Sequence, residues 1–124
     1  MEKSIRTVVV LGASDKRERH SNRAIRLLKS EGYRVIPVHP TLETIEGFPV
    51  VHSLKEIQEP VHTLTIYLSP DRCRPLIDDI VALRPERVIL NPYTEFDEIK
   101  TRLTEAGIPF LEACTLVMLS TGQF

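Results

Sequence analysis

The sequence has no excess of charge of either sign, because 16 Lys and Arg residues stand against 17 Asp and Glu residues and the formal net charge is -1. This balance gives no support for a surface that binds nucleic acid or another polyanion. Long apolar runs are also lacking, since none approaches the ~20 residues of a membrane helix. The N-terminal residues contain no apolar segment of the secretory kind. We therefore expect a cytoplasmic protein that binds neither nucleic acid nor a membrane.

Cysteine is scarce, with Cys73 and Cys114 as its two occurrences. They form no CxxC motif and have no histidines at zinc-site spacing, so neither a metal site nor a redox centre is indicated. We expect both to be reduced thiols. The sequence also lacks internal repeats, low-complexity tracts and linkers, so its 124 residues are expected to form one domain over 1–124.

Apolar runs of strand length recur along the chain. The first is a continuous aliphatic and β-branched run, typical of a strand that is buried on both faces of a parallel sheet. Pro109, in the last run, suits a strand at the edge of a sheet. The predicted strands span residues 7–11, 33–38, 62–68, 87–90 and 108–111.

Helical signals lie between these runs. Ser21 is the expected N-cap of a helix over 22–31, which Gly32 ends in the left-handed conformation. Ser69 and Pro70 are the expected N-cap and first residue of the next long helix. The remaining predictions are a short helix over 54–58 after Ser53, a helix opened by residues 94–97 and closed by Gly107, an irregular loop over 39–53, and a tail over 114–119 that is either a short helix or extended.

This alternation of strands and helices predicts an α/β fold: a doubly wound, mainly parallel five-stranded sheet with helices on both faces. Ligands of such sheets bind beyond the carboxyl ends of the strands, near the point where the strand order reverses. Four loops are placed there by the predicted strands, namely residues 12–21, 39–41, 69–72 and 91–95.

The first of these loops has the features of a phosphate-binding loop. It begins Gly12-Ala13-Ser14 and lacks the full G-x-G-x-x-G pattern, which disfavours an ordinary NAD site. The loop is basic, and a helix start at Ser21 would direct backbone N–H groups toward it, which favours a phosphorylated ligand. The alternative is a charged loop that is merely solvated. The basic residues of the loop are Lys16, Arg17, Arg19 and His20.

Candidates for acid, base or nucleophilic catalysis are His20, His39, Glu95 and Cys114. No two of them have a spacing that requires a catalytic pair, and each has an ordinary structural role available. We therefore expect no catalytic residues.

Several segments together resemble the small single-domain CoA-binding proteins of Rossmann type, which are related to the N-terminal domain of the succinyl-CoA synthetase α subunit. The resemblance covers nearly the whole chain and implies a Rossmann-like form of the predicted fold. It rests on residues 10–15 leading to His20-Ser21, 32–38 with Pro40, Gly47 followed by Val50 and Ser53-Leu54, Asn91-Pro92 with Thr94-Glu95, and 112–119.

The resemblance implies a nucleotide-binding site for CoA or an acyl-CoA. Gly12, Ala13, Ser14 and the helix start at Ser21 would hold the CoA phosphates, and residues 39–40 and 67–70 would border the adenosine. The loop over 91–95 would form the wall opposite residues 12–21. The full set of expected ligand-binding residues is Gly12, Ala13, Ser14, Lys16, Arg19, His20, Ser21, His39, Pro40, Leu68, Ser69, Pro70, Asn91, Pro92, Tyr93, Thr94 and Glu95.

The chain departs from the family pattern at three positions. Tyr93 replaces a common glycine, Phe96 a common asparagine, and Thr41 a lysine that is a possible phosphate partner. Tyr93 either strains its loop, fills the ligand space, stacks on a base or bonds a phosphate, and the sequence leaves these alternatives open. A mixed disulfide between Cys73 and the CoA thiol is a further option.

The expected function is therefore binding of CoA or an acyl-CoA without catalysis. One alternative is a component of an acyl-CoA-dependent or nucleotide-dependent enzyme that requires a partner subunit. Another is an interaction or regulatory protein that keeps the fold without the ligand. A homodimer contact through the apolar tail is also possible.

Overall fold

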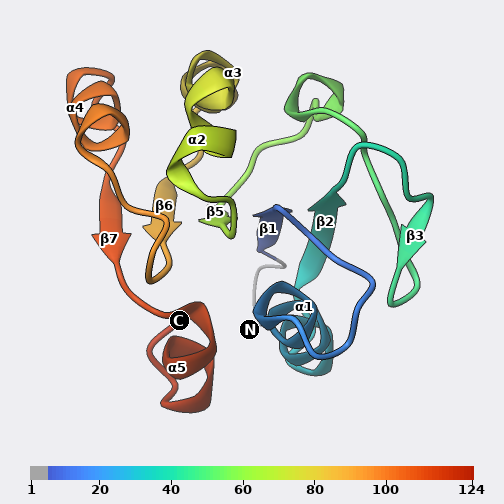
Figure 1. Ribbon diagram of the computed structural model, residues 1–124. Coiled ribbons are helices and arrows are strands. Elements are labelled where there is room, and N and C mark those ends of the chain that lie inside the picture. Colours follow the sequence, from blue (N-terminus) through green and yellow to red (C-terminus); the bar gives the residue numbers. More distant parts are fainter. Residues whose placement is uncertain (1–5) are drawn as a thin grey trace.

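Five parallel strands form a sheet in the order β2-β1-β5-β6-β7 in the computed structural model, which describes residues 6–124 (Figure 1). The strand order reverses direction between β1 and β5, so the ends of these two strands define the crevice where ligands of this architecture bind. The predicted doubly wound α/β fold is confirmed. The strands are β1 (Thr7–Leu11), β2 (Arg34–Val38), β5 (Thr63–Ile66), β6 (Arg87–Leu90) and β7 (Phe110–Glu112).

Helices cover both faces of the sheet, and every residue of the central strand β1 is therefore buried. Val8 and Val10 belong to a cluster with α1 (His20–Ser30) and α5 (Thr115–Ser120). Val9 and Leu11 belong to the opposite cluster, which includes side chains of α3 (Ile77–Leu83) and α4 (Asp97–Glu105). The alternation of side chains along one strand therefore divides the core into two layers.

Helix α1 begins earlier than predicted. Its N-cap is Arg19 rather than Ser21, and no side chain caps it. Ser21 lies inside the first turn and is buried, so burial against the core, rather than capping, accounts for its place. The predicted end is confirmed, because Gly32 has φ +88 directly after the helix.

The segment after β5 is more broken than predicted. Pro70 is the first residue of α2 (Pro70–Cys73), as expected, but the Ser69 side chain makes no capping bond. Pro75, which has no N–H to donate, lies in the 3₁₀ turn η2 (Arg74–Leu76) that separates α2 from α3. Helix α4 begins after Phe96, because Thr94 is held in a preceding turn through its hydroxyl bond to the Asn91 carbonyl.

The predicted loop over 39–53 contains a small hairpin. Its strands, β3 (Thr44–Ile45) and β4 (Phe48–Pro49), are joined by Glu46 and Gly47, both with positive φ as in a type I′ turn. The short helix predicted over 54–58 is the 3₁₀ turn η1 (Leu54–Glu56), with Ser53 Oγ accepting from Lys55 N–H.

The last elements of the chain are the edge strand β7 and the helix α5. The ambiguous tail forms α5, and β7, next to Pro109, is an edge strand as expected. No helix within residues 6–124 combines the length and hydropathy needed to cross a membrane. The expectation about a secretory segment concerns the N-terminal residues, of which 1–5 lie outside the described part of the chain.

Candidate functional site

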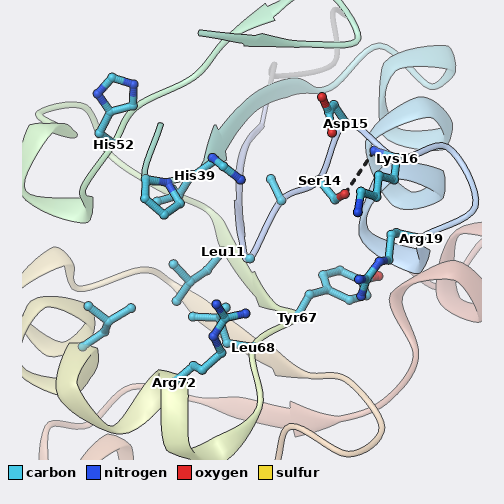
Figure 2. Close-up of a pocket in the computed structure, with 15 residues that line it drawn as sticks. Leu11, Ser14, Asp15, Lys16, Arg19, His39, His52, Tyr67, Leu68 and Arg72 are labelled. Carbon is cyan, nitrogen blue, oxygen red and sulfur yellow. Dashed lines mark hydrogen bonds between the residues drawn. The ribbon is translucent and has the colours of Figure 1, made fainter. Parts of the chain in front are cut away.

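A cavity of about 500 Å³ opens at the carboxyl ends of β1, β2 and β5, beside the reversal of the strand order (Figure 2). Apolar side chains and basic groups share its wall, a combination that suits a ligand with both apolar and anionic parts. The lining residues are Leu11, Gly12, Ala13, Ser14, Asp15, Lys16, Arg19, Val38, His39, Pro40, His52, Tyr67, Leu68, Arg72 and Leu76.

The loop after β1 passes very close to the end of β5. Gly12 has φ +89, and a Cβ added there would lie 3.0 Å from both the Tyr67 carbonyl carbon and Leu68 Cδ2. The Ala13 N–H donates to the Val38 carbonyl at 3.2 Å, which fixes the loop to β2. Glycine is therefore required at position 12 both by the backbone angle and by the close approach.

Backbone donors are available where the loop turns. Ser14 Oγ accepts from the Lys16 N–H at 3.0 Å. The N–H groups of Ser14 and Asp15, by contrast, donate to no group of the described chain. Arg19, the uncapped N-cap of α1, also lines the cavity, and the first turn of that helix contains no acidic residue. Unpaired N–H groups beside a helix N-terminus favour an anionic ligand.

A buried amide fixes this loop from behind. Asn22, which is fully buried in α1, donates through Nδ2 to the Ser14 carbonyl at 3.0 Å and to Glu46 Oε2 at 3.2 Å. Its Oδ1 accepts from Arg26 Nε at 2.8 Å. Sequence reasoning missed Asn22, although a buried polar residue within an otherwise apolar helix stripe is a signal for such a role.

The basic residues divide into paired and unpaired groups. Within residues 6–124, Lys16, Arg19 and Arg72 line the cavity and form no ion pair. Arg17, which was expected to add charge to the loop, instead points to Glu46 with an N–O distance of 3.2 Å. Asp15 is the carboxylate on the cavity wall. The cavity therefore carries an excess of positive charge.

The two histidines of the cavity are held by the segment after β2. His39 Nδ1 accepts from the N–H groups of Thr41 and Leu42, both at 3.1 Å, so a neutral His39 carries its proton on Nε2. His52 Nε2 lies 3.1 Å from the Leu42 carbonyl oxygen. The sequence assigned no role to His52, because the turns that bring it to the cavity are not visible in a local pattern.

Tyr67 forms the part of the wall next to the sheet. Burial raises the pKa of Tyr67 to about 12. Its hydroxyl lies near Thr65 and Thr115, whose own hydroxyls bond each other at 2.8 Å, and it makes no hydrogen bond within the described chain. The Tyr67 phenol is therefore neutral at ordinary pH and is a buried donor without an acceptor.

The cavity brings together part of the expected set. Of the predicted ligand-binding residues, the ones on its wall are Gly12, Ala13, Ser14, Lys16, Arg19, His39, Pro40 and Leu68. His20 is exposed in the first turn of α1, and Ser21 is buried there. Ser69 and Pro70 lie at the start of α2 and do not line the cavity.

The loop over 91–95 does not form the wall opposite residues 12–21. That wall consists of Tyr67, Leu68, Arg72 and Leu76, because β5 and not β6 lies next to β1. Pro92, Tyr93 and Glu95 instead line a separate depression of about 260 Å³, together with Leu90, Glu112, Ala113 and Cys114.

The two buried members of that loop have structural partners. Asn91 Nδ2 donates to Thr65 Oγ1 at 2.7 Å and to the Ile66 carbonyl at 2.8 Å, while its Oδ1 accepts from the Thr115 N–H at 2.9 Å. Asn91 thereby joins β5, the end of β6 and α5. Thr94 is held by its bond to the Asn91 carbonyl.

Neither cysteine lies in the larger cavity. Cys73 is fully buried, and burial raises its pKa to about 11, so a reactive thiolate is disfavoured there. Cys114 is half-buried and lines the smaller depression. A mixed disulfide at Cys73 has no support from this geometry. Within residues 6–124, no cluster of His, Cys, Asp and Glu has the arrangement of a metal site.

One known protein is similar to this chain over nearly its whole length, and another over about half of it. A crystal structure of an uncharacterized protein superposes with a TM-score of 0.90 at 35% identity, covering 98% of this chain and 100% of that one. The uncharacterized protein YneT of Bacillus subtilis (strain 168) is 35% identical over 60 residues, which is 48% of this chain and 44% of YneT. The matched segment therefore spans less than half of that relative.

A larger protein contains the same fold. Part of the dinucleotide forming acetyl-coenzyme A synthetase 1 from Ca. Korarchaeum cryptofilum superposes with a TM-score of 0.76 at 20% identity. The match covers 86% of this chain and 26% of the synthetase, so it shows a shared fold. Residues 6–120 match a family model described as a CoA binding domain, and the chain therefore belongs to the CoA binding domain family.

Proposed function

We propose that the protein binds CoA or an acyl-CoA, with the nucleotide end of the ligand in the 500 Å³ cavity. The observation that carries this proposal is the set of three cations on the wall of that cavity, Lys16, Arg19 and Arg72, which form no ion pair within residues 6–124. Charged side chains that have no partner in the protein are available to an anionic ligand. Membership of the CoA binding domain family supports the choice of CoA among such ligands.

The diphosphate would lie at the loop after β1. The N–H groups of Ser14 and Asp15 and the N-terminal end of α1 supply donors there, and Lys16 and Arg19 supply charge. Each of these groups stabilises an anion without a change in the fold.

The adenosine would lie on the apolar part of the wall. Leu68 and Leu76 come from the segment after β5, whereas Val38 ends β2 and Pro40 follows it, so the two groups of apolar side chains can contact the base. His39 Nε2–H is the matching polar donor, since Nδ1 is occupied by two backbone bonds.

The proposed role is binding without catalysis. Neither cysteine lines the cavity, and His39 is held through Nδ1 by the backbone rather than by a nucleophile. These features support a ligand-binding module. The fold shared with part of an acetyl-coenzyme A synthetase supports a second candidate, in which a partner chain supplies the reaction.

Calorimetric titration with CoA, 3′-dephospho-CoA and ADP tests the proposal. We expect CoA to bind and Arg19→Gln to weaken it about tenfold, as expected for loss of one charge-assisted bond. Arg23→Gln removes an equal charge from the exposed face of the same helix outside the cavity and is the matched control. Absence of CoA binding at millimolar concentration would refute the proposal.

The second candidate needs a separate experiment. Affinity purification from the source cells, followed by an acyl-CoA synthetase assay of any stable complex, would show turnover that the isolated chain lacks. Recovery of the chain without a stoichiometric partner would count against this candidate and leave CoA binding unaffected.

A further inference from the structure

We propose that Arg72 is a specificity-determining residue that recognises a second phosphate, on the ribose of the ligand, and so selects CoA over 3′-dephospho-CoA. This inference rests on the proposed function and assigns one group of the ligand to one side chain. It divides the cations of the cavity into a diphosphate pair, Lys16 and Arg19, and a separate partner for the ribose phosphate.

The three cations come from two different segments. Lys16 and Arg19 belong to the loop between β1 and α1, whereas Arg72 belongs to α2, which follows β5. Figure 2 shows the Arg72 side chain rising from α2 across the cavity from Ser14 and Lys16, with Leu68 close beside it. The positive charge is therefore distributed over two walls.

A diphosphate needs only one of these walls, because its two phosphorus atoms share a bridging oxygen and lie together. The loop after β1 already offers the Ser14 and Asp15 N–H groups and two cations to such a group. A cation on the other wall suits an anionic group attached elsewhere on the ligand. In CoA that group is the phosphate on the 3′ position of the ribose.

The neighbouring arginine shows what a structural role would look like in this segment. Arg74 forms ion pairs with Asp71 at 3.0 Å and Glu98 at 2.9 Å, and its guanidinium lies 5.2 Å from the centre of the Phe96 ring. Arg72 has no ion pair or side-chain hydrogen bond among residues 6–124, and it lines the cavity. The two arginines are two residues apart and have opposite surroundings.

The loop after β1 likewise contains one arginine in an ion pair and one that lines the cavity. Arg17 is paired with Glu46, while Arg19, two residues later, lines the cavity without an ion pair in the described chain. In both segments, therefore, the arginine at the cavity is the one that has no ion pair in the part of the chain that the structure describes. A guanidinium in this state can form a bidentate contact with a phosphate.

The experiment compares ligands that differ by one phosphate, across three matched variants. The dissociation constants of CoA and 3′-dephospho-CoA are measured by calorimetry for the wild type, Arg72→Gln, Arg74→Gln and Arg19→Gln. Adenosine 3′,5′-bisphosphate and AMP form a second pair without the pantetheine arm. Circular dichroism and thermal melting confirm that each variant is folded.

We expect the wild type to prefer CoA over 3′-dephospho-CoA by about tenfold, the effect of one charge-assisted bond. Arg72→Gln should abolish this preference by weakening CoA alone, with the affinity for 3′-dephospho-CoA unchanged. Arg74→Gln should leave the preference intact, and Arg19→Gln should weaken both ligands by the same factor. A merely structural role for Arg72 would lower both affinities together.

The experiment distinguishes failure of the proposed role of Arg72 from failure of the proposed CoA binding. If CoA binds but Arg72→Gln retains the preference for the 3′-phosphate, or if the wild type has no such preference, the role of Arg72 is wrong and the proposed function stands. If no CoA binds, the proposed function fails first.

Discussion

Asn22 and Glu46 are 24 residues apart in the chain, and a hydrogen bond of 3.2 Å joins the Asn22 amide to the Glu46 carboxylate. The same amide holds the Ser14 carbonyl. The turn of the β3–β4 hairpin, helix α1 and the loop at the cavity thus share one buried group. The conformation of that loop depends on contacts that lie outside the cavity.

Replacement of Asn22 by alanine should lower stability, although Asn22 does not itself line the cavity. It leaves the Ser14 carbonyl and Arg26 Nε without their partner, and loss of such buried bonds costs about 2 kcal/mol. Urea denaturation measures this as a lower free energy of unfolding. Arg23→Ala, an exposed substitution on the same helix, should change it by less than about 0.5 kcal/mol. Equal stability of the two variants would contradict this role of Asn22.

Gly12→Ala should be more damaging than Gly32→Ala. Both glycines have φ near +90, so alanine is strained by about 1 kcal/mol at either position. At Gly32 the new methyl group meets nothing within 4 Å, whereas at Gly12 it lies 3.0 Å from the carbonyl carbon of Tyr67. Thermal melting should therefore show a larger drop for Gly12→Ala, accompanied by weaker CoA binding that Gly32→Ala does not cause. Similar melting temperatures would show that the close approach costs nothing.

Stability should fall at alkaline pH. The pKa of Tyr67 is raised from 10.0 to about 12 in the folded state, so the neutral phenol is favoured by folding. Below pH 10 this contribution is fully present, and it is lost as the pH rises through 12, because the unfolded chain releases its proton first. Cys73, with its pKa raised from 9.0 to about 11, acts in the same direction from pH 9 upward.

The measurement is urea denaturation between pH 8 and pH 11.5, with Tyr67→Phe as the control. Because phenylalanine has no proton to lose, the variant should show a smaller decline in the free energy of unfolding above pH 10. An identical decline in both proteins would mean that other groups cause it.

The two thiols should react at very different rates. Cys114 is half-buried beside the smaller depression, whereas Cys73 is fully buried with a raised pKa, which keeps it protonated. A chromogenic disulfide reagent at pH 8 should modify Cys114 first and reach Cys73 only after denaturation. Cys114→Ser should therefore show no fast phase, and a persistent fast phase would place the reactive thiol at Cys73.

Tyr93→Gly should stabilise the protein. Tyr93 has φ +72 and is 89% exposed, so its side chain contributes little burial while its backbone angle is strained. Glycine at that position should raise the free energy of unfolding by about 1 kcal/mol. Tyr93→Ala keeps the strain and should give no such gain. ADP affinity should stay the same in both variants, because Tyr93 lines the smaller depression and not the larger cavity. A change in ADP affinity would place Tyr93 at the nucleotide.

Local pattern was sufficient for much of the fold. The run over 7–11 coincides with β1 and the run over 87–90 with β6, since a continuous apolar segment of that length is stable mainly as a buried strand. Gly32 marks the end of α1 because few other residues adopt its positive φ. The hairpin around Glu46 was missed because each of its strands is two residues long, too short for a periodic signal.

The residues that line the cavity could be predicted only in part from the sequence. The loops that follow β1, β2 and β5 could be located from the sequence, because each comes directly after an apolar run of strand length. The predicted residues that line the cavity are Gly12, Ala13, Ser14, Lys16, Arg19, His39, Pro40 and Leu68. His52 and Leu76 were not found, since each reaches the cavity through a turn that no local pattern specifies.

The sequence by itself determined the parallel sheet, the helices on both faces and the turn at Gly12, because these depend on hydrophobic periodicity and on backbone angles of single residues. The tertiary structure alone decided which loops meet. The pairing of β5 with β1 places Arg72 opposite Lys16 and moves residues 91–95 to a separate depression. The tertiary structure also decided which arginines form ion pairs with carboxylates, such as Arg17 and Arg74. Strand order and ion pairing arise from contacts between residues distant in the chain, and no local pattern contains them.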